Sequence, residues 1–292
     1  MTLLLLLAVL ATATLGTGLA AWLDRVLAGG TGPAGLAADW LRGPVQTEAP
    51  DEMNRRLAPA WYLALALAGL SVVPFAPGAA LIDSPVGIVI WGSCEALIVV
   101  TVFLHGWSPN ALFPLIGAYR YAAIGLPVML PSMFVLIAAA LPAESLSLLA
   151  VVDSQREIWN VLRQPLGLPL FLLVILAMTL RGPMDYADGA DIATGTSAEE
   201  AGPARALWQV ARLAMLVSAS AIAATVFLGG PLGPVLPGPV WLWLKTAAVM
   251  ALVVALGARL ARPTPSQMLW LLWVVLLPLS FLHLAISGVI LL

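Results

Sequence analysis

The sequence predicts an all-α polytopic membrane protein with about eight transmembrane helices and both termini on the outer, periplasmic side. Of the 292 residues, 61% are hydrophobic and only 10% are charged, whereas a soluble domain carries about 25% charged residues. The mean hydropathy is +1.00. Apolar stretches recur along the whole chain, and arginine-bearing connections separate them. These observations together indicate a bundle of membrane-crossing helices.

Eight stretches approach the roughly 20 apolar residues that a membrane-crossing helix needs. They are Leu3–Leu23, Leu57–Phe75, Val86–Leu104, Ala122–Leu141, Leu166–Leu180, Ala206–Leu228, Val240–Leu260 and Met268–Leu291. The first is interpreted as an uncleaved helix rather than a signal peptide, because no basic region precedes it and Asp24-Arg25 follows it directly. Residues 1–292 are therefore expected to form a single transmembrane domain.

Arginines set the predicted orientation. Cytoplasmic loops are enriched in basic residues, and the odd-numbered loops hold nine arginines against one or two in the even-numbered loops. The nine are Arg25, Arg42, Arg55, Arg56, Arg120, Arg181, Arg205, Arg259 and Arg262. The odd-numbered loops are therefore predicted to face the cytoplasm.

Two of these cytoplasmic loops are long. Residues 24–56 include Ala34–Leu41, an amphipathic stretch typical of a helix that lies along the membrane interface. Residues 181–205 are acidic and contain Asp185, Asp188, Asp191, Glu199 and Glu200. Such a loop is either a solvated connection or a docking surface. Five carboxylates in a loop predicted to face the cytoplasm favour docking.

One carboxylate falls in the middle of a predicted span. Glu95 lies in an apolar stretch, where burying a carboxylate is costly unless the residue is functional or paired. It is a candidate proton-transfer group, or else a protonated side chain hydrogen-bonded to a neighbouring helix. Lys245, early in the seventh span, either reaches the outer interface or points into a polar axis.

The chain is predicted to bind no metal or redox cofactor of its own. Cys94 is the single cysteine, and His105 and His283 lie far apart in the sequence. These residues provide neither a thiolate cluster nor a local metal motif. No basic run suggests nucleic acid as a partner. A stand-alone ion transporter with Glu95 as its ion site is an alternative, although the sequence has no internal repeat of the kind that many transporters contain.

Several stretches, in order along the chain, resemble the H subunit of respiratory complex I, which is also called subunit 1. They are R-L-A-P at 56–59, G-W-S-P-N through G-A-Y-R at 106–120, S-L-S-L through D-S-Q at 145–155, S-A through F-L-G-G at 218–230, L-K-T at 244–246 and L-L-P-L-S at 276–280. The acidic loop is similar as well. Its matching positions are Arg181, Pro183, Asp185, Asp188 and Glu199, with Asp191 near another acidic position of the family.

The resemblance implies a coupling and anchoring subunit of an energy-converting oxidoreductase in the bacterial inner membrane. Its partners would be iron–sulfur peripheral subunits and antiporter-like membrane subunits. Flavin, iron–sulfur clusters or nickel–iron would be held by those partners, with quinone bound at the interface. The proton-relay candidates are then Glu95, Asp185, Asp188, Asp191, Glu199 and Lys245. The candidates for facing quinone or partner subunits are Arg25, Asp39, Arg42, Arg181 and Arg205.

Several departures indicate a divergent relative of that family. Met129 and Met178 stand where the family has intramembrane glutamates, whereas Glu95 stands where it usually has a small residue. The first loop keeps only residues 31–36 of a stretch that lines the family's quinone entrance. The same fold serves the membrane anchors of membrane-bound hydrogenases and formate hydrogenlyases, which need no quinone, so such an anchor is an alternative. A scaffold that has lost coupling is a further one.

Overall fold

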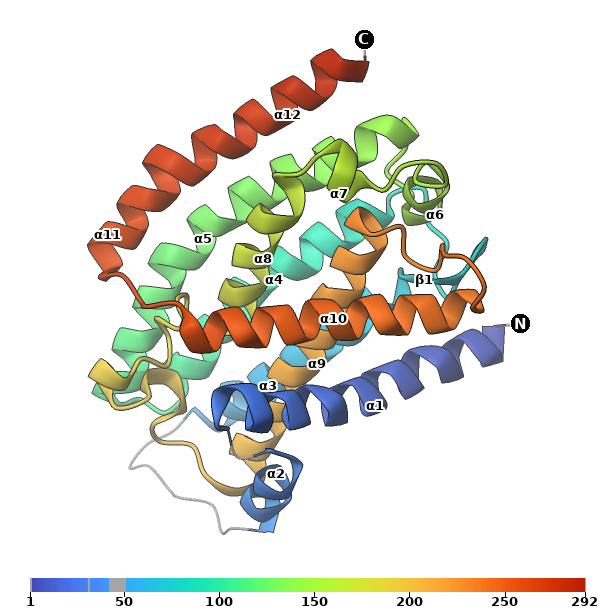
Figure 1. Cartoon of the computed structure of the whole chain (residues 1–292). Coiled ribbons are helices and arrows are strands. Elements are labelled where there is room, and N and C mark those ends of the chain that lie inside the picture. The colour runs from blue at the N-terminus through green and yellow to red at the C-terminus, as the bar shows by residue number, and fades with distance from the viewer. Residues whose placement is uncertain (1, 31, 42–50, 292) are drawn as a thin grey trace.

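The computed structural model describes residues 2–30, 32–41 and 51–291. Its apolar stretches are helical, because a chain in hydrocarbon must satisfy its backbone hydrogen bonds internally. The helices are α1 (Thr2–Ala28), α2 (Gly32–Leu41), α3 (Glu52–Ser71), α4 (Gly87–Trp107), α5 (Leu112–Ala140), α6 (Leu148–Asp153), α7 (Asn160–Arg163), α8 (Gly167–Met178), α9 (Gly202–Phe227), α10 (Gly238–Arg259), α11 (Pro265–Trp270) and α12 (Leu277–Leu291). Figure 1 shows them as one bundle.

Short elements join these helices. Strands β1 (Pro74–Ala76) and β2 (Ala79–Ala80) form a small antiparallel hairpin after α3. Single 3-10 turns are η1 (Leu141–Ala143), η2 (Ala190–Ile192) and η3 (Gly195–Ser197), and a π-helical stretch, η4 (Leu271–Leu276), connects α11 to α12. The turns η2 and η3 belong to the predicted acidic loop.

Within the described residues, six helical segments are long and apolar enough to cross a membrane. They are α1, α4, α5 extended through η1, α9, α10 and the continuous segment from α11 to α12. These segments confirm an all-α polytopic membrane protein. The second predicted span is α3, which carries Glu52, Arg55 and Arg56 in its first turns, and the fifth is α8, which has 12 residues. The count of eight spans and the outward termini stay predictions.

Several predicted helix boundaries were wrong. The first helix ends at Ala28 rather than Leu23, and the second begins at Glu52 rather than Leu57, so Arg25, Arg55 and Arg56 lie in helices. The fourth helix begins at Leu112 rather than Ala122, so Arg120 lies inside α5 and not in a loop. The sixth begins at Gly202 rather than Ala206, which places Arg205 in the first turn of α9. Long basic side chains reach out of the hydrocarbon from a helix end, so a helix continues past them. The amphipathic stretch Ala34–Leu41 is helical, as part of α2.

Helix α9 lies at the centre of the bundle, where it packs against α1, α2, α3, α8 and α10. Small residues allow these close approaches. A Cβ atom added to Gly16 of α1 would lie 2.7 Å from Val217, and one added to Gly69 of α3 would lie 2.6 Å from Ser218 Oγ. Close van der Waals packing of this kind drives helix association in lipid.

Helices α4 and α5 pack antiparallel, and their glycines fix the register. Gly92 faces Met133, and Gly106 faces Ala118. The two helices keep this antiparallel register between the Gly92–Met133 and Gly106–Ala118 contacts. Glu95 of α4 therefore lies nearly level with Met129 of α5. This register brings Glu95 beside the neighbouring helix at the depth where Met129 stands.

Candidate functional site

Charged residues from five parts of the chain meet at one end of the bundle. We call this group the ion-paired end: Asp24, Arg120, Arg181, Asp185, Asp188, Asp191, Arg212 and Arg262. The segment between α8 and α9 supplies four of them, and α1, α5, α9 and the α10–α11 connection supply one each. The loop acids were expected to act here, and three of them, Asp185, Asp188 and Asp191, each have an arginine partner from elsewhere in the chain.

Arg181 and Arg212 anchor the loop to the helices. Arg181 donates two hydrogen bonds to the Asp24 carboxylate of α1, at 2.5 and 2.8 Å. Arg212 of α9 donates to Asp188 at 2.8 Å. Both pairs are largely shielded from solvent, with 22% or less of each side chain exposed. Such shielding makes them stronger contributors to the loop's position than surface pairs.

Asp191 bridges two further arginines. It accepts hydrogen bonds from Arg120 of α5 and from Arg262 after α10, and Arg262 also lies 3.6 Å from Asp185. The hydrogen bond from Arg120 is the largest influence that holds the pKa of Asp191 below its usual value, and Arg262 acts in the same direction. Asp191 is therefore held in its charged form.

The carboxyl end of α8 lies beside these pairs and is covered by donors from three helices. The last carbonyls of a helix have no intrahelical partner. Here Tyr121 of α5 donates to Ala177 O at 3.2 Å, and Tyr62 of α3 donates to Met178 O. Arg212 donates to the next two carbonyls, Thr179 O at 3.1 Å and Leu180 O at 2.8 Å. Hydroxyl and guanidinium donors therefore follow one another along the end of α8.

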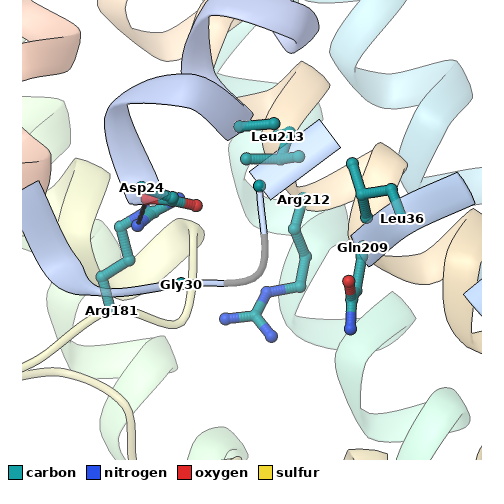
Figure 2. A pocket seen from close by; sticks show the side chains of 9 residues that line it. Asp24, Gly30, Leu36, Arg181, Gln209, Arg212 and Leu213 are labelled. Atoms are coloured by element: carbon teal, nitrogen blue, oxygen red, sulfur yellow. Dashed lines mark hydrogen bonds and ion pairs between the residues drawn. The ribbon is translucent and has the colours of Figure 1, made fainter. Parts of the chain in front are cut away.

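Two cavities of about 190 and 420 Å³ lie against the ion-paired end. They share Arg181, Gln209 and Arg212 as lining residues. The smaller cavity opens between α1, α2 and α9, with Ala21 and Leu36 among its walls. Figure 2 shows the Asp24–Arg181 pair on one side and Arg212 and Gln209 pointing the same way on the other. The shared wall of the two cavities thus carries several N–H donors in partly apolar surroundings.

The fold of the loop depends on Gly195. Its φ is +49°, and an added Cβ atom would collide with Ala187 O. The next residue, Thr196, donates its backbone N–H to Ala187 O at 3.0 Å and its hydroxyl to Asp188. These contacts turn the loop back on itself and fix the Asp188 carboxylate toward Arg212.

Glu95 lies away from this end, inside α4. The residue is fully buried, and Ser132 Oγ of α5 donates to its carboxyl oxygen at 2.9 Å. Its second oxygen has no hydrogen-bond partner among the described residues. Glu95 thus has one fixed hydrogen bond to α5, and the Trp91 side chain on its own helix lies close enough to act on the same carboxyl group.

The other predicted site residues lie in different places. Lys245 is at the opposite end of the bundle, where its Nζ donates to the carbonyls of Leu228, Gly230 and Leu232 that follow α9. Arg205 Nε lies 3.9 Å from Asp39, which joins α9 to α2. Arg25 is exposed at the end of α1, and Glu199 is partly buried. Arg42 lies outside the described residues.

Several residues of the site were not predicted from the sequence. Arg212 and Gln209 lie within a predicted apolar span, and an arginine inside such a span is itself a signal of function or pairing. Glu200 is 3% exposed, whereas only its neighbour Glu199 was predicted as a proton-relay residue. Burial raises the pKa of the Glu200 carboxyl to about 7. No pattern in the sequence distinguishes these two adjacent glutamates.

Comparison with known proteins gives consistent matches over most of the chain. The family model described as NADH dehydrogenase matches residues 1–288. An H subunit of NADH-quinone oxidoreductase from Rhodopseudomonas palustris strain HaA2 is 36% identical over 241 residues, which cover 82% of this chain and 76% of that protein. An H subunit of NADH-quinone oxidoreductase from Cereibacter sphaeroides strain ATCC 17029 is 34% identical over 304 aligned positions, which cover 98% of this chain and 94% of that protein.

Proposed function

Because the chain belongs to the family of NADH-quinone oxidoreductase H subunits, we propose that it is the membrane-embedded coupling subunit of a complex I-like enzyme in the bacterial inner membrane. The relatives are named as subunits, so the chain is one part of a multi-subunit membrane complex. In our proposal it joins a peripheral electron-transfer part to proton-translocating, antiporter-like membrane subunits. Flavin and iron–sulfur clusters belong to the peripheral partners.

The ion-paired end is the proposed contact with the peripheral part. Its inner pairs fix the loop, while Asp191 and the nearby Arg205 keep 46% and 43% of their side chains exposed. Exposed charges on a rigid base suit a protein partner, because complementary charges orient the two surfaces as they meet. This arrangement supports docking rather than a solvated connection.

Quinone is the proposed ligand of the two cavities. A quinone head group carries two carbonyl acceptors, and its tail is apolar. Arg212 and Gln209 provide side-chain N–H donors in the wall that the cavities share, while Ala21 and Leu36 provide apolar contacts between α1 and α2. Ligand sites commonly combine a mainly apolar lining with a few polar groups that fix orientation. The quinone tail would leave between α1 and α2 toward the lipid.

Glu95 is the proposed proton-carrying acid inside the membrane, and its burial beside Ser132 is the observation that carries the coupling proposal. The resemblance implies glutamates at Met129 and Met178, which this chain lacks. The α4–α5 register sets Glu95 nearly level with Met129, so a carboxyl group occupies the same depth from the neighbouring helix. A carboxyl at this depth is expensive to bury and is usually kept for a function.

Purification of the chain with its partners tests the proposal that it is a subunit of a complex I-like enzyme. An affinity tag is placed on this chain, the complex is extracted from membranes in a mild detergent, and the subunits are identified by mass spectrometry. We expect iron–sulfur and antiporter-like subunits together with NADH-dependent quinone reduction. Replacing Asp185 and Glu199 together by alanine should lower the yield of peripheral subunits. Recovery of the chain alone, or with a nickel–iron hydrogenase subunit, would contradict the proposal.

A further inference from the structure

His105 on α4 is a buried histidine whose polar atoms have no structural use. The residue is fully buried, and neither ring nitrogen has a hydrogen-bond partner among the described residues. Nearly all buried polar groups in proteins are hydrogen-bonded to protein or to ordered water. A residue needed only to fill space would be apolar, because unpaired nitrogens add a desolvation cost without adding contacts. The imidazole therefore calls for a functional explanation.

Its surroundings connect the ion-paired end with the interior. The His105 ring stacks on Trp208 of α9 with 3.7 Å between ring centroids, and Tyr62 stacks on the same tryptophan at 5.0 Å. The adjacent Gly106 packs against Thr196, where an added Cβ would lie 2.7 Å from the threonine methyl group. The Thr196 hydroxyl in turn donates to Asp188. Gly106, the residue next to His105 in the sequence, thus contacts the loop that contains Asp188.

Two hydroxyl groups continue from here toward Glu95. Tyr62 and Tyr121 donate to consecutive carbonyls of α8, Met178 O and Ala177 O, so their hydroxyl groups are neighbours. Tyr62 lies within electrostatic range of Arg212 and Asp188, and Tyr121 within range of Tyr62 and Glu95. Ten residues along α4 separate His105 from Glu95, a rise of about 15 Å at 1.5 Å per residue. Direct transfer over this length is excluded, and intermediate carriers are needed.

We propose that His105 carries protons between the Asp188–Arg212 pair and Glu95, with the Tyr62 and Tyr121 hydroxyls and water molecules as intermediate carriers. This inference rests on the proposed function. In each passage the neutral imidazole accepts a proton at one ring nitrogen and releases the proton from the other, after which the ring returns to its first tautomer. Only N–H and O–H bonds form and break, so no oxidant or reductant is required and the ring gains no lasting charge.

The test uses the complete complex in sealed vesicles, with quinone reduction and proton movement measured in the same sample. We expect His105→Leu and His105→Gln to reduce quinone while losing proton movement per electron. His283→Leu is the matched control, because His283 is also buried on α12 with an unpaired Nε2 but lies beside Gly167 and away from this set of residues. It should keep the wild-type ratio.

Imidazole rescue separates proton transfer from a packing role. His105→Gly leaves space for the ring, so added imidazole should restore proton movement in this variant and leave His105→Leu unchanged. A wild-type ratio in His105→Leu or His105→Gln would overturn the proposal, as would a His105→Gly variant that assembles and is not rescued. Wild-type vesicles that move no protons would overturn the proposed coupling function itself.

Discussion

Arg212 holds three parts of the ion-paired end with one side chain. Its guanidinium group donates to Thr179 O and Leu180 O at the end of α8 and to the Asp188 carboxylate of the loop. An arginine can do this because its donors lie in a fixed planar fork, whereas the lysine ammonium is a compact point charge. The residue therefore sets the position of the loop relative to α8 and α9.

Replacing Arg212 by methionine should destabilise the protein strongly. Removing one partner of a buried ion pair costs about 3–5 kcal/mol. Because 22% of the Arg212 side chain is exposed, we expect the lower end of that range. Thermal unfolding of the purified complex in detergent measures the change. The control is Arg156→Met, since Arg156 and its partner Asp153 are 61% and 57% exposed, and exposed pairs contribute about 0–1 kcal/mol. Equal losses in both variants would contradict this account.

Glu200 should make stability depend on pH. Burial raises the pKa of its carboxyl group from 4.5 to about 7 in the folded state, against the opposing influence of Arg55, and Glu52 adds to the rise. In the unfolded chain the pKa returns toward its ordinary value, so the folded state binds more protons between these values. The stability contributed by protonated Glu200 is thus fully present below about pH 4.5 and is lost as the pH rises through about 7.

The free energy of unfolding should therefore fall over this interval, by at most about 1.4 kcal/mol per pH unit for this one group. Denaturation of the complex at several pH values measures the slope. Glu200→Gln should flatten it relative to wild type, while Glu199→Gln, which makes the same change at the partly buried neighbour, should not. A slope that is identical in wild type and Glu200→Gln would rule out this role.

The local sequence predicts where Glu95 lies but not which residues it contacts. A carboxylate in an apolar stretch is visible from the sequence, and the residue is indeed inside α4. Its partner Ser132 is 37 residues away and becomes its neighbour only through the α4–α5 register. The burial of Glu200 escaped prediction for the same reason, because it depends on segments distant in the sequence. Arg212 was visible as an arginine in an apolar stretch, but its partners Thr179, Leu180 and Asp188 were not.

At the level of elements, the loop between α8 and α9 acquires its shape from a glycine and from distant arginines. Apolar length predicted α8 at nearly its observed bounds, Gly167–Met178. The loop's turns η2 and η3 and the hairpin of β1 and β2 were not predicted, because their conformations depend on tertiary contacts. The aspartates predicted in this loop lie at one end of the bundle, but only the folded chain shows which arginine each aspartate meets.

Gly195→Ala should loosen this loop. The residue has a φ of +49°, and an added Cβ would meet Ala187 O. A strained backbone position of this kind costs about 1–3 kcal/mol when a side chain is forced into it. We expect lower quinone reduction and faster proteolysis of the loop in membranes. Gly18→Ala on α1 is the control, since nothing lies within 4 Å of its added Cβ. Equal behaviour of the two variants would mean that the loop tolerates rearrangement.

For the molecule as a whole, the distribution of arginines predicts which end of the bundle faces the cytoplasm. In the described chain, α1 begins and α12 ends at the same end of the bundle, which is the end away from the ion-paired end (Figure 1). Reporter fusions after Leu292 and within residues 193–198 test the orientation in the membrane. We expect the first outside and the second in the cytoplasm. A cytoplasmic signal from the fusion after Leu292 would refute the predicted topology.

The coupling claim concerns the whole complex and is tested at Glu95. Glu95→Gln keeps the shape of the side chain and its bond from Ser132 but removes ionisation, so the complex should assemble and reduce quinone. The decisive measurement is the number of protons moved per electron in sealed vesicles that contain this variant. We expect normal quinone reduction with proton movement lost or greatly reduced. A ratio equal to that of the wild type would show that Glu95 only supports the structure, and would contradict the account.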